Sequence, residues 1–203
     1  MDLERRFFTR EIRMETGADG QRKLIGYAAV FNQLSEDLGG FREMILPGSF
    51  ANVVGGDVRA LFNHDPNLIL GRTTARTLRI EEDDIGLRYE VDLPDTQTGR
   101  DLTISADRGD VNQSSFGFRV VPEGESWREP TDDEPLPVRL IHLFQRLYDV
   151  SPVVFPAYPQ TSAEARSMAQ QLAQSGATAG GRSPLRTDGR LAQLRRRLDL
   201  LEL

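Results

Sequence analysis

The sequence VNQSSFGFRV, residues 111–120, predicts the strand around which the fold is built. Side chains of a strand alternate between its two faces, which places Phe116 and Phe118 on one face and Ser115 and Gly117 on the other. The aromatic face is the better core face, so we expect Ser115 to point away from the core. Gly117 has no side chain and leaves space on the same face as the serine hydroxyl.

Two other segments place a polar side chain at or near the end of an apolar run. Residues 61–66, LFNHDP, carry His64 at a strand-to-loop junction, and residues 147–158, LYDVSPVVFPAY, carry Asp149. A carboxylate in an apolar segment is costly unless it has a partner. Together with Ser115, these segments supply a serine, a histidine and a carboxylate. These are the three side chains that nucleophilic acyl transfer by a serine requires.

Each of these residues also has an ordinary structural interpretation. Ser115 could be a small polar residue on a wet strand face, and His64 could be a loop histidine that bonds locally. Asp149 could pair with an arginine. Ser114 lies on the face opposite to Ser115, so we predict Ser115 as the nucleophile. His142, in a segment that also reads as plain strand, competes with Asp149 for the third role.

The composition bounds the kinds of site that the chain can hold. A formal net charge of −6 over 203 residues argues against nucleic acid as the main partner, because phosphate binding needs a basic face. The absence of cysteine and the presence of two histidines exclude thiolate and histidine-rich metal sites. The acidic run at residues 81–84 lacks the spacing of an EF-hand loop and reads as a solvated turn. We expect no signal peptide and no membrane span, since no run approaches about 18 apolar residues.

Many short apolar runs separated by turn signals predict a β-rich fold. The clearest is residues 86–93, where apolar and charged residues alternate. Pro152 and Pro156 suggest an edge or bulged position for the last strand. Helices are expected over residues 47–54 and 95–108, a loop over 122–137, and further strands over 3–13, 24–31, 58–62, 68–72, 77–80, 112–121, 138–144 and 147–155. This order favours a mainly β (α+β) fold: a closed or partly open, mostly antiparallel β-barrel with flanking helices.

Six pieces of the chain occur in a specific order: GYAAVFN (26–32), EMILPGSF (43–50), LFNHDP (61–66), LGR (70–72), SFGF (115–118) and LYDVSPVVFPAY (147–158). In this order they resemble the prohead (head-maturation) serine proteases of tailed bacteriophages, which are related in fold to herpesvirus assemblin. The resemblance covers about residues 5–162. It implies a herpesvirus-protease-like fold.

The resemblance implies His64 as the general base and Ser115 as the nucleophile. The third member falls at an acidic position that the family usually fills with glutamate and that is Asp149 here, one methylene shorter. Assemblin uses a second histidine as its third member, which keeps His142 as the alternative. The implied mechanism uses no metal and no cofactor.

The resemblance, together with a change in composition after about residue 160, predicts a division of the chain. The serine protease domain would span residues 1–162. A small, polar, glycine-rich linker is expected over residues 163–190, followed by an amphipathic C-terminal helix over residues 191–203. Family members often carry removable or scaffold-binding tails, so self-cleavage near the linker is a hypothesis.

The function implied is that of a serine endopeptidase that cleaves scaffold or capsid-precursor protein, and itself, during head assembly. Its partners would be the major capsid protein and that protein's scaffolding segment, inside the phage procapsid in the host cytoplasm. The assemblin resemblance adds a homodimer. The alternative is a catalytically inactive capsid-assembly or scaffold module with the same fold. A metal-dependent hydrolase is disfavoured because the chain has two histidines and no HExxH pattern.

Overall fold

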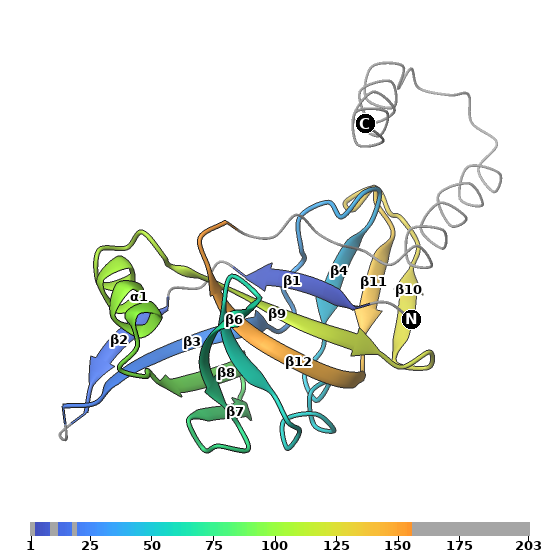
Figure 1. Ribbon diagram of the computed structural model, residues 1–203. Coiled ribbons are helices and arrows are strands. Elements are labelled where there is room, and N and C mark those ends of the chain that lie inside the picture. Colours follow the sequence, from blue (N-terminus) through green and yellow to red (C-terminus); the bar gives the residue numbers. More distant parts are fainter. Residues whose placement is uncertain (1–2, 9–11, 18–19, 156–203) are drawn as a thin grey trace, which may run out of the picture.

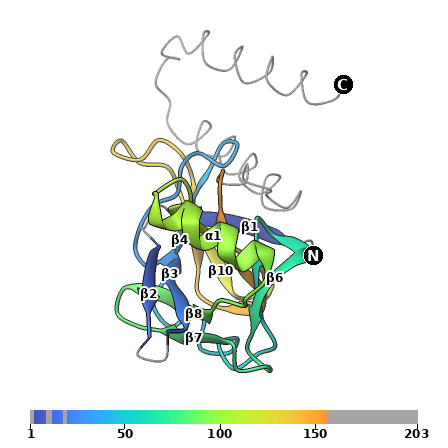
Figure 2. The same ribbon diagram turned by 60° about the vertical axis from the view of Figure 1, so that its left-hand side comes forward.

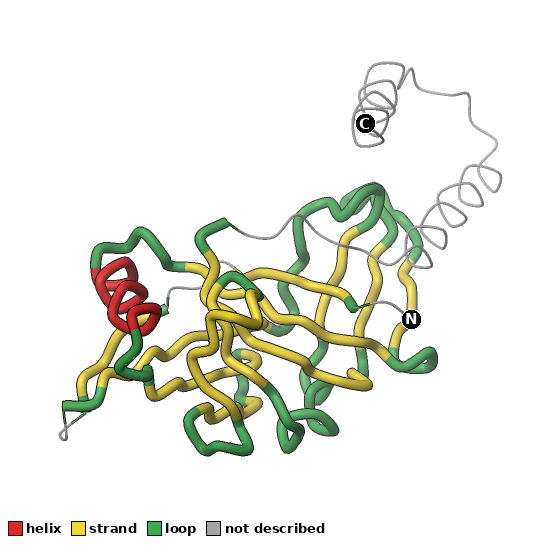
Figure 3. The backbone as a smooth tube through the Cα atoms, in the orientation of Figure 1, coloured by secondary structure: helices red, strands yellow, loops and turns green. Residues whose placement is uncertain are grey.

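The computed structural model describes residues 3–8, 12–17 and 20–155 of the chain. Twelve strands and one helix lie in this part of the chain (Figures 1 and 3). In chain order they are β1 (Glu4–Phe8), β2 (Arg13–Thr16), β3 (Arg22–Val30), β4 (Arg42–Ile45), β5 (Arg59–Phe62), β6 (Asp65–Arg72), β7 (Leu78–Glu82), β8 (Gly86–Asp92), α1 (Gln97–Asp107), β9 (Gln113–Val120), β10 (Glu125–Arg128), β11 (Val138–Ile141) and β12 (Phe144–Val153).

Strand β9 lies in the interior of a five-stranded sheet with the order β1-β9-β12-β5-β6. It pairs antiparallel with β1 on one side and with β12 on the other, and β12 pairs parallel with β5. Phe116 and Phe118 are fully buried on the core face, with ring centroids 4.8 Å apart. Phe50 and Phe144 pack against these two rings. The predicted strand is confirmed, and its aromatic face forms the centre of the core.

Two smaller sheets, β10-β11-β4 and β2-β3-β8-β7, complete the fold. Figure 1 shows the three-stranded sheet at one end of the molecule and the four-stranded sheet at the other, on the side of α1. Helix α1 packs beside β2 and β6 (Figure 2). In β8, Leu87, Tyr89 and Val91 are fully buried while Arg88 and Glu90 are partly exposed. This confirms the alternation predicted for residues 86–93.

The mainly β class is confirmed; of the predicted closed or partly open barrel, the closed form is not found. Within the described residues all three sheets are open, and the edge strands β1 and β6 are not paired with each other. Most pairings are antiparallel, whereas β12–β5 and β11–β4 are parallel. A barrel closes only when its first and last strands pair with matching tilt and stagger. The alternation of side chains along one strand does not specify which strands pair.

The described residues contain one helix where two were expected. Helix α1, predicted over residues 95–108, is confirmed, and Thr96 caps it by accepting a main-chain hydrogen bond from the first turn at 3.2 Å. Residues 47–54 instead form consecutive turns, in which most main-chain hydrogen bonds span three residues. Gly48 has a φ of 86°, which lies outside the helical region. The prediction of a helix there was wrong.

Two other expected elements differ from the structure. The strand expected over residues 3–13 is replaced by β1 and β2, which join different sheets; residues 9–11 lie outside the described residues. The loop expected over residues 122–137 contains β10, which pairs antiparallel with β11. Trp127 of β10 packs against Phe41, with ring centroids 5.2 Å apart. This tertiary contact stabilises a strand in an acidic segment whose local sequence favours a loop.

The last strand was predicted to be an edge or a bulged strand. β12 is an interior strand, but its pairing with β9 has register shifts between Phe144 and Arg146 and between Leu147 and Asp149, so the bulged alternative is confirmed. Pro152 itself lies beyond these shifts. The N–H and C=O groups of a strand residue point to the same side, and the Pro152 carbonyl accepts a hydrogen bond from the Asn63 N–H at 3.0 Å. The side of Pro152 on which an N–H group is missing therefore faces β5. The pairing of β5 with β12 ends at Val150, two residues before the proline. Proline is tolerated in an interior strand here because the ladder loses no hydrogen bond.

The end of the predicted protease domain at residue 162, the linker predicted over 163–190 and the helix predicted over 191–203 all lie outside the described residues. In the described part of the chain, no helix has the length and apolar character needed to cross a membrane.

Candidate active site

The turn between β5 and β6 carries His64. Asn63 and His64 both have left-handed backbone conformations, with φ of 54° and 58°, which are uncommon for residues other than glycine. Two hydrogen bonds attach Asn63 to the end of β12: its N–H donates to Pro152 O at 3.0 Å, and its Oδ1 accepts from Val154 N–H at 2.9 Å. These bonds hold the turn against the sheet, within reach of β9 and β12.

Ser115 lies on the face of β9 opposite to the aromatic core. Its Oγ is 2.6 Å from Nε2 of His64. Ser114 points to the other face, where its hydroxyl forms a 2.7 Å hydrogen bond with the Tyr89 hydroxyl, whose pKa is raised by burial. Ser115 is fully buried rather than wet, because the turn that carries His64 lies over this face.

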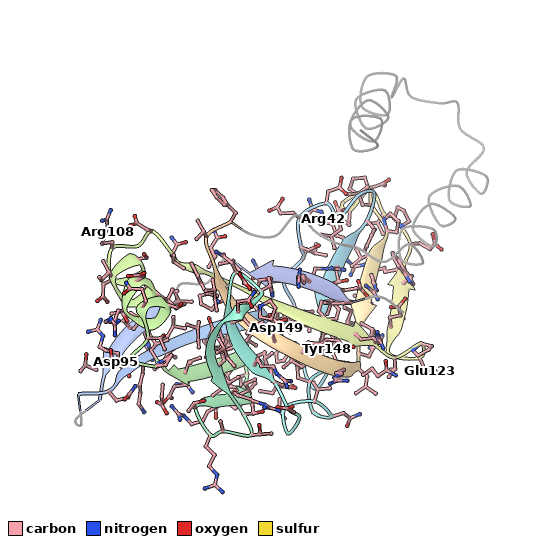
Figure 4. The ribbon with its side chains drawn as sticks, in the orientation of Figure 1. Arg42, Asp95, Arg108, Glu123, Tyr148 and Asp149 are labelled. Atoms are coloured by element: carbon pink, nitrogen blue, oxygen red, sulfur yellow. The ribbon has the colours of Figure 1, made fainter. Side chains whose placement is uncertain are left out.

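Asp149 comes from β12, the strand next to β9. Its Oδ1 is 2.5 Å from Nδ1 of His64. The pairing of the two strands sets Asp149 opposite Gly117, and a Cβ atom at residue 117 would lie 2.5 Å from Asp149 Oδ2. The missing side chain therefore makes room for the carboxylate, and an aspartate is long enough to reach the imidazole. Figure 4 shows Asp149 near the middle of the molecule, away from the ends where Asp95 and Glu123 are labelled.

The hydrogen bonds assign a role to each ring nitrogen of His64. An ionised carboxylate only accepts hydrogen bonds, so Nδ1 carries the proton that Asp149 accepts. A neutral imidazole then leaves Nε2 as the acceptor for the Ser115 hydroxyl. His64 is 8% exposed and Asp149 is 5% exposed, and such burial strengthens the electrostatic part of both hydrogen bonds. This arrangement can move the hydroxyl proton to the imidazole while the carboxylate holds the ring.

His142, the alternative third member, lies elsewhere. Its Nε2 is 2.5 Å from the Ser126 hydroxyl of β10, and its backbone N–H donates to Gly124 O at 2.7 Å. The structure thus brings Asp149, and not His142, against His64. The alternative in which Asp149 pairs with an arginine is not what the structure shows, since the carboxylate contacts the imidazole of His64.

Side chains of the acidic run at residues 81–84 accept hydrogen bonds from neighbouring parts of the fold. Asp83 accepts hydrogen bonds from the Ile85 N–H at 2.8 Å and from the Tyr27 hydroxyl at 2.6 Å. Glu82 accepts from the Phe50 N–H at 3.0 Å. Among the residues that the structure describes, no three acidic, histidine or cysteine side chains are grouped so that they could hold a metal ion.

Ser151 is a residue of the site that the sequence reasoning missed. It is fully buried, and its hydroxyl donates to Asp149 Oδ1 at 2.8 Å. A spacing of two residues along a strand puts both side chains on one face. That signal could have found Ser151, because Asp149 was already a candidate.

A serine hydroxyl, an imidazole and a carboxylate hydrogen bonded in this order form the constellation used by serine hydrolases, here built on a mainly β fold. The chain belongs to the caudovirus prohead serine protease family, whose model matches residues 8–174. No curated protein and no solved structure matches the chain. The relation in fold to herpesvirus assemblin therefore stays a prediction.

Proposed function

We propose that this protein is a prohead maturation protease, a serine endopeptidase that cleaves scaffold or capsid-precursor protein during head assembly. The observation that carries the proposal is the 2.6 Å hydrogen bond between Ser115 Oγ and His64 Nε2. The contact of His64 Nδ1 with Asp149 supports it, as does membership of a family of serine proteases.

In the first half-reaction, Ser115 Oγ attacks the carbonyl carbon of the scissile peptide bond while His64 Nε2 takes the hydroxyl proton. A carbon–oxygen bond forms, and negative charge develops on the carbonyl oxygen. When the carbon–nitrogen bond breaks, His64 gives its proton to the leaving amine. Asp149 keeps the ring oriented and stabilises the imidazolium that forms in between.

In the second half-reaction, water takes the place of the amine. His64 removes a proton from the water, whose oxygen attacks the acyl carbon of the ester on Ser115. The ester bond breaks, His64 returns the proton to Ser115 Oγ, and the carboxylic acid leaves. No step needs a metal ion or a cofactor.

The proposed substrates are the major capsid protein and its scaffolding segment, inside the procapsid in the host cytoplasm. A prohead protease acts on proteins of the head, and membership of that family supports this choice. Ser115 has no exposed surface, so binding of a substrate peptide would require the groups around its hydroxyl to move.

The test is cleavage of purified capsid precursor, followed on a gel. Ser115→Ala and His64→Ala should each abolish cleavage, because each removes a group that takes part in proton transfer and bond formation. Ser114→Ala, which removes the neighbouring hydroxyl on the opposite face, should cleave as the unchanged protein does. Normal cleavage by either of the first two variants would disprove the proposed roles.

The third member is tested by a direct comparison. Asp149→Ala should lower the cleavage rate by about three to four orders of magnitude, as expected when an imidazole loses its orienting carboxylate. His142→Ala, at a site bonded to Ser126, should change the rate little. The reverse result would assign the third role to His142.

The alternative is an inactive assembly module with the same fold. Such a module would be free to lose the three side chains, but Ser115, His64 and Asp149 are all present and hydrogen bonded. The alternative would regain support if the purified protein cleaved no capsid precursor under conditions of assembly.

Self-cleavage and a homodimer are further parts of the proposal. Mass spectrometry of the expressed chain should show loss of a C-terminal fragment with a cut near the linker expected over residues 163–190. Ser115→Ala should keep its full mass. Sedimentation of that same variant measures whether it forms a homodimer.

A further inference from the structure

We infer that Ser151 is a positioning residue of the proposed protease: its hydroxyl holds the Asp149 carboxylate in the orientation in which it supports His64. The inference rests on the function proposed for the site. Ser151 would act through Asp149 and not on the substrate, so it is not a fourth catalytic residue.

Two donors reach the same oxygen of Asp149 from different elements. His64 Nδ1 lies 2.5 Å from Oδ1, and Ser151 Oγ lies 2.8 Å from it. The imidazole comes from the turn after β5, whereas Ser151 follows Asp149 by two residues on β12 itself. The hydrogen bond from Ser151 therefore does not depend on the position of the turn. It can orient the carboxylate independently of the imidazole.

The neighbouring strand leaves space beside the second oxygen. Oδ2 of Asp149 lies 2.5 Å from the position that a Cβ atom on residue 117 would take, and Gly117 has no such atom. No side chain at residue 117 therefore restrains the carboxylate, whereas the Ser151 hydroxyl holds Oδ1 from β12 itself. Without that hydroxyl, the angle of the carboxylate plane is less well defined.

The charge of Asp149 makes this hydrogen bond worth more than one between neutral groups. Asp149 and Ser151 are both buried, and a buried carboxylate that loses a donor loses a charge-assisted hydrogen bond. The carboxylate interacts most strongly with His64 when the ring becomes an imidazolium during the reaction. A carboxylate that is loosely held then stabilises the transition state less, even when the resting structure is unchanged.

An ordinary structural role for Ser151 makes a different prediction. A buried hydroxyl needs an acceptor, and Asp149 would serve as one whatever the site does. In that case, removal of the hydroxyl would lower the stability of the fold, but the folded molecules would react at the usual rate. The discriminating quantity is the rate constant per folded molecule.

The experiment uses the full chain and a fluorophosphonate probe, which forms a phosphorus–oxygen bond with an activated serine and releases fluoride. The variants Ser151→Thr and Ser151→Val form a matched pair. Threonine and valine side chains have nearly the same shape, but threonine has a hydroxyl where valine has a methyl group. We expect the threonine variant to react nearly as fast as the unchanged protein. Ser151→Val and Ser151→Ala should lose about 10-fold to 100-fold in kinact, the range of a charge-assisted hydrogen bond, with KI unchanged.

Ser114→Ala is the matched control for the loss of a buried strand hydroxyl. Ser114 is as buried as Ser151, but its hydroxyl bonds to Tyr89 on the other face of β9. It should lower the free energy of unfolding, though by less than Ser151→Ala because its bond joins two neutral groups, and it should leave kinact unchanged. Urea denaturation of each variant shows that the reacting protein is folded. Ser151→Ala, the smallest change, carries the test if the larger side chains prevent folding.

The outcomes separate the inference from the function on which it rests. If folded Ser151→Ala reacts within about twofold of the unchanged protein, Ser151 has only a structural role and the inference is overturned. If the unchanged protein is not labelled, or Ser115→Ala is labelled equally well, then the proposed nucleophile is wrong and the inference fails with it.

Discussion

Asp149 has room beside β9 because residue 117 is a glycine. A methyl group there would lie 2.5 Å from Asp149 Oδ2, closer than any van der Waals contact. We therefore expect Gly117→Ala to displace the carboxylate from His64 and to lower the cleavage rate by about 10-fold or more, the scale of a charge-assisted hydrogen bond. The free energy of unfolding should also decrease, because the displaced carboxylate loses a buried charge-assisted hydrogen bond; the lower flexibility of alanine in the unfolded chain offsets about 0.4–1 kcal/mol of this loss.

Gly55→Ala is the matched control for this substitution. No atom lies within 4 Å of a Cβ built at residue 55, so the same chemical change meets open space there. Cleavage measured alongside circular dichroism checks both variants. An unchanged rate in Gly117→Ala would mean that the carboxylate can shift without loss of its contact with the imidazole.

At the scale of elements, the turn between β5 and β6 positions the proposed base. Asn63 contributes a left-handed conformation and the acceptor for Val154 N–H. Asn63→Gly removes the acceptor but keeps the conformation accessible, whereas Asn63→Ala removes both. We expect the alanine variant to be less stable than the glycine variant by about 1 kcal/mol, the cost of a Cβ atom in this conformation.

Both Asn63 variants should cleave more slowly than the unchanged protein, because the turn holds His64 against β9 and β12. Urea denaturation gives the order of stability, and gel assays give the rates. If Asn63→Ala proved as stable as Asn63→Gly, the left-handed turn would not be a constraint on this part of the fold.

At the scale of the whole molecule, a buried ionic cluster joins two of the three sheets. Arg139 of β11 donates to Glu4 of β1 at 2.7 Å and to Glu43 of β4 at 3.0 Å. Arg6 of β1 donates to the same two carboxylates, at 2.7 and 3.0 Å. Glu125 of β10 binds Arg139 at the rim of the cluster. The cluster thus links the strand next to β9 with the three-stranded sheet.

Loss of one partner from this cluster should destabilise the protein strongly. Arg139→Met would leave Glu4 and Glu43 buried with one fewer cation, which typically costs about 3–5 kcal/mol. Arg79→Met is the control, because Arg79 pairs with Glu90 and Asp92 at the surface and such pairs contribute below about 1 kcal/mol. Urea denaturation measures both, and equal losses would contradict the assigned role of the cluster.

The same cluster predicts sensitivity to acid. Burial opposes ionisation, but the hydrogen bond from Arg139 and the charges of Arg6 and Arg139 together hold the pKa of Glu4 below its usual value of 4.5. A carboxyl group with a lowered pKa stabilises the fold above its unfolded pKa, and this contribution is lost as the pH falls through the folded pKa. The free energy of unfolding should therefore decrease as the pH is lowered from about 5.

Glu4→Gln isolates this contribution. The variant should be less stable than the unchanged protein at about pH 7, and its stability should decline less steeply in acid, because one titrating group is gone. Urea denaturation at pH values between about 7 and 3 provides the comparison. Glu90 and Asp92 also have lowered pKa values, and they contribute to the acid sensitivity of both proteins. If the free energy of unfolding declined equally in both proteins, Glu4 would not be a cause of the acid sensitivity.

The amino-acid pattern alone was enough for the mainly β class, for the buried faces of β8 and β9 and for the position of α1. Alternation along a strand is a local property, so it can be recognised in the sequence without knowledge of the tertiary contacts. The same reading selected Ser115, His64 and Asp149 as candidates, one from each of three segments.

How these segments meet depends on the tertiary structure. His64 reaches both Ser115 and Asp149 because β12 lies between β9 and β5. Strand order, the open sheets and the turns at residues 47–54 all follow from contacts between segments far apart in the chain. Such contacts are chosen by the packing of the whole core, and no short stretch of sequence contains them.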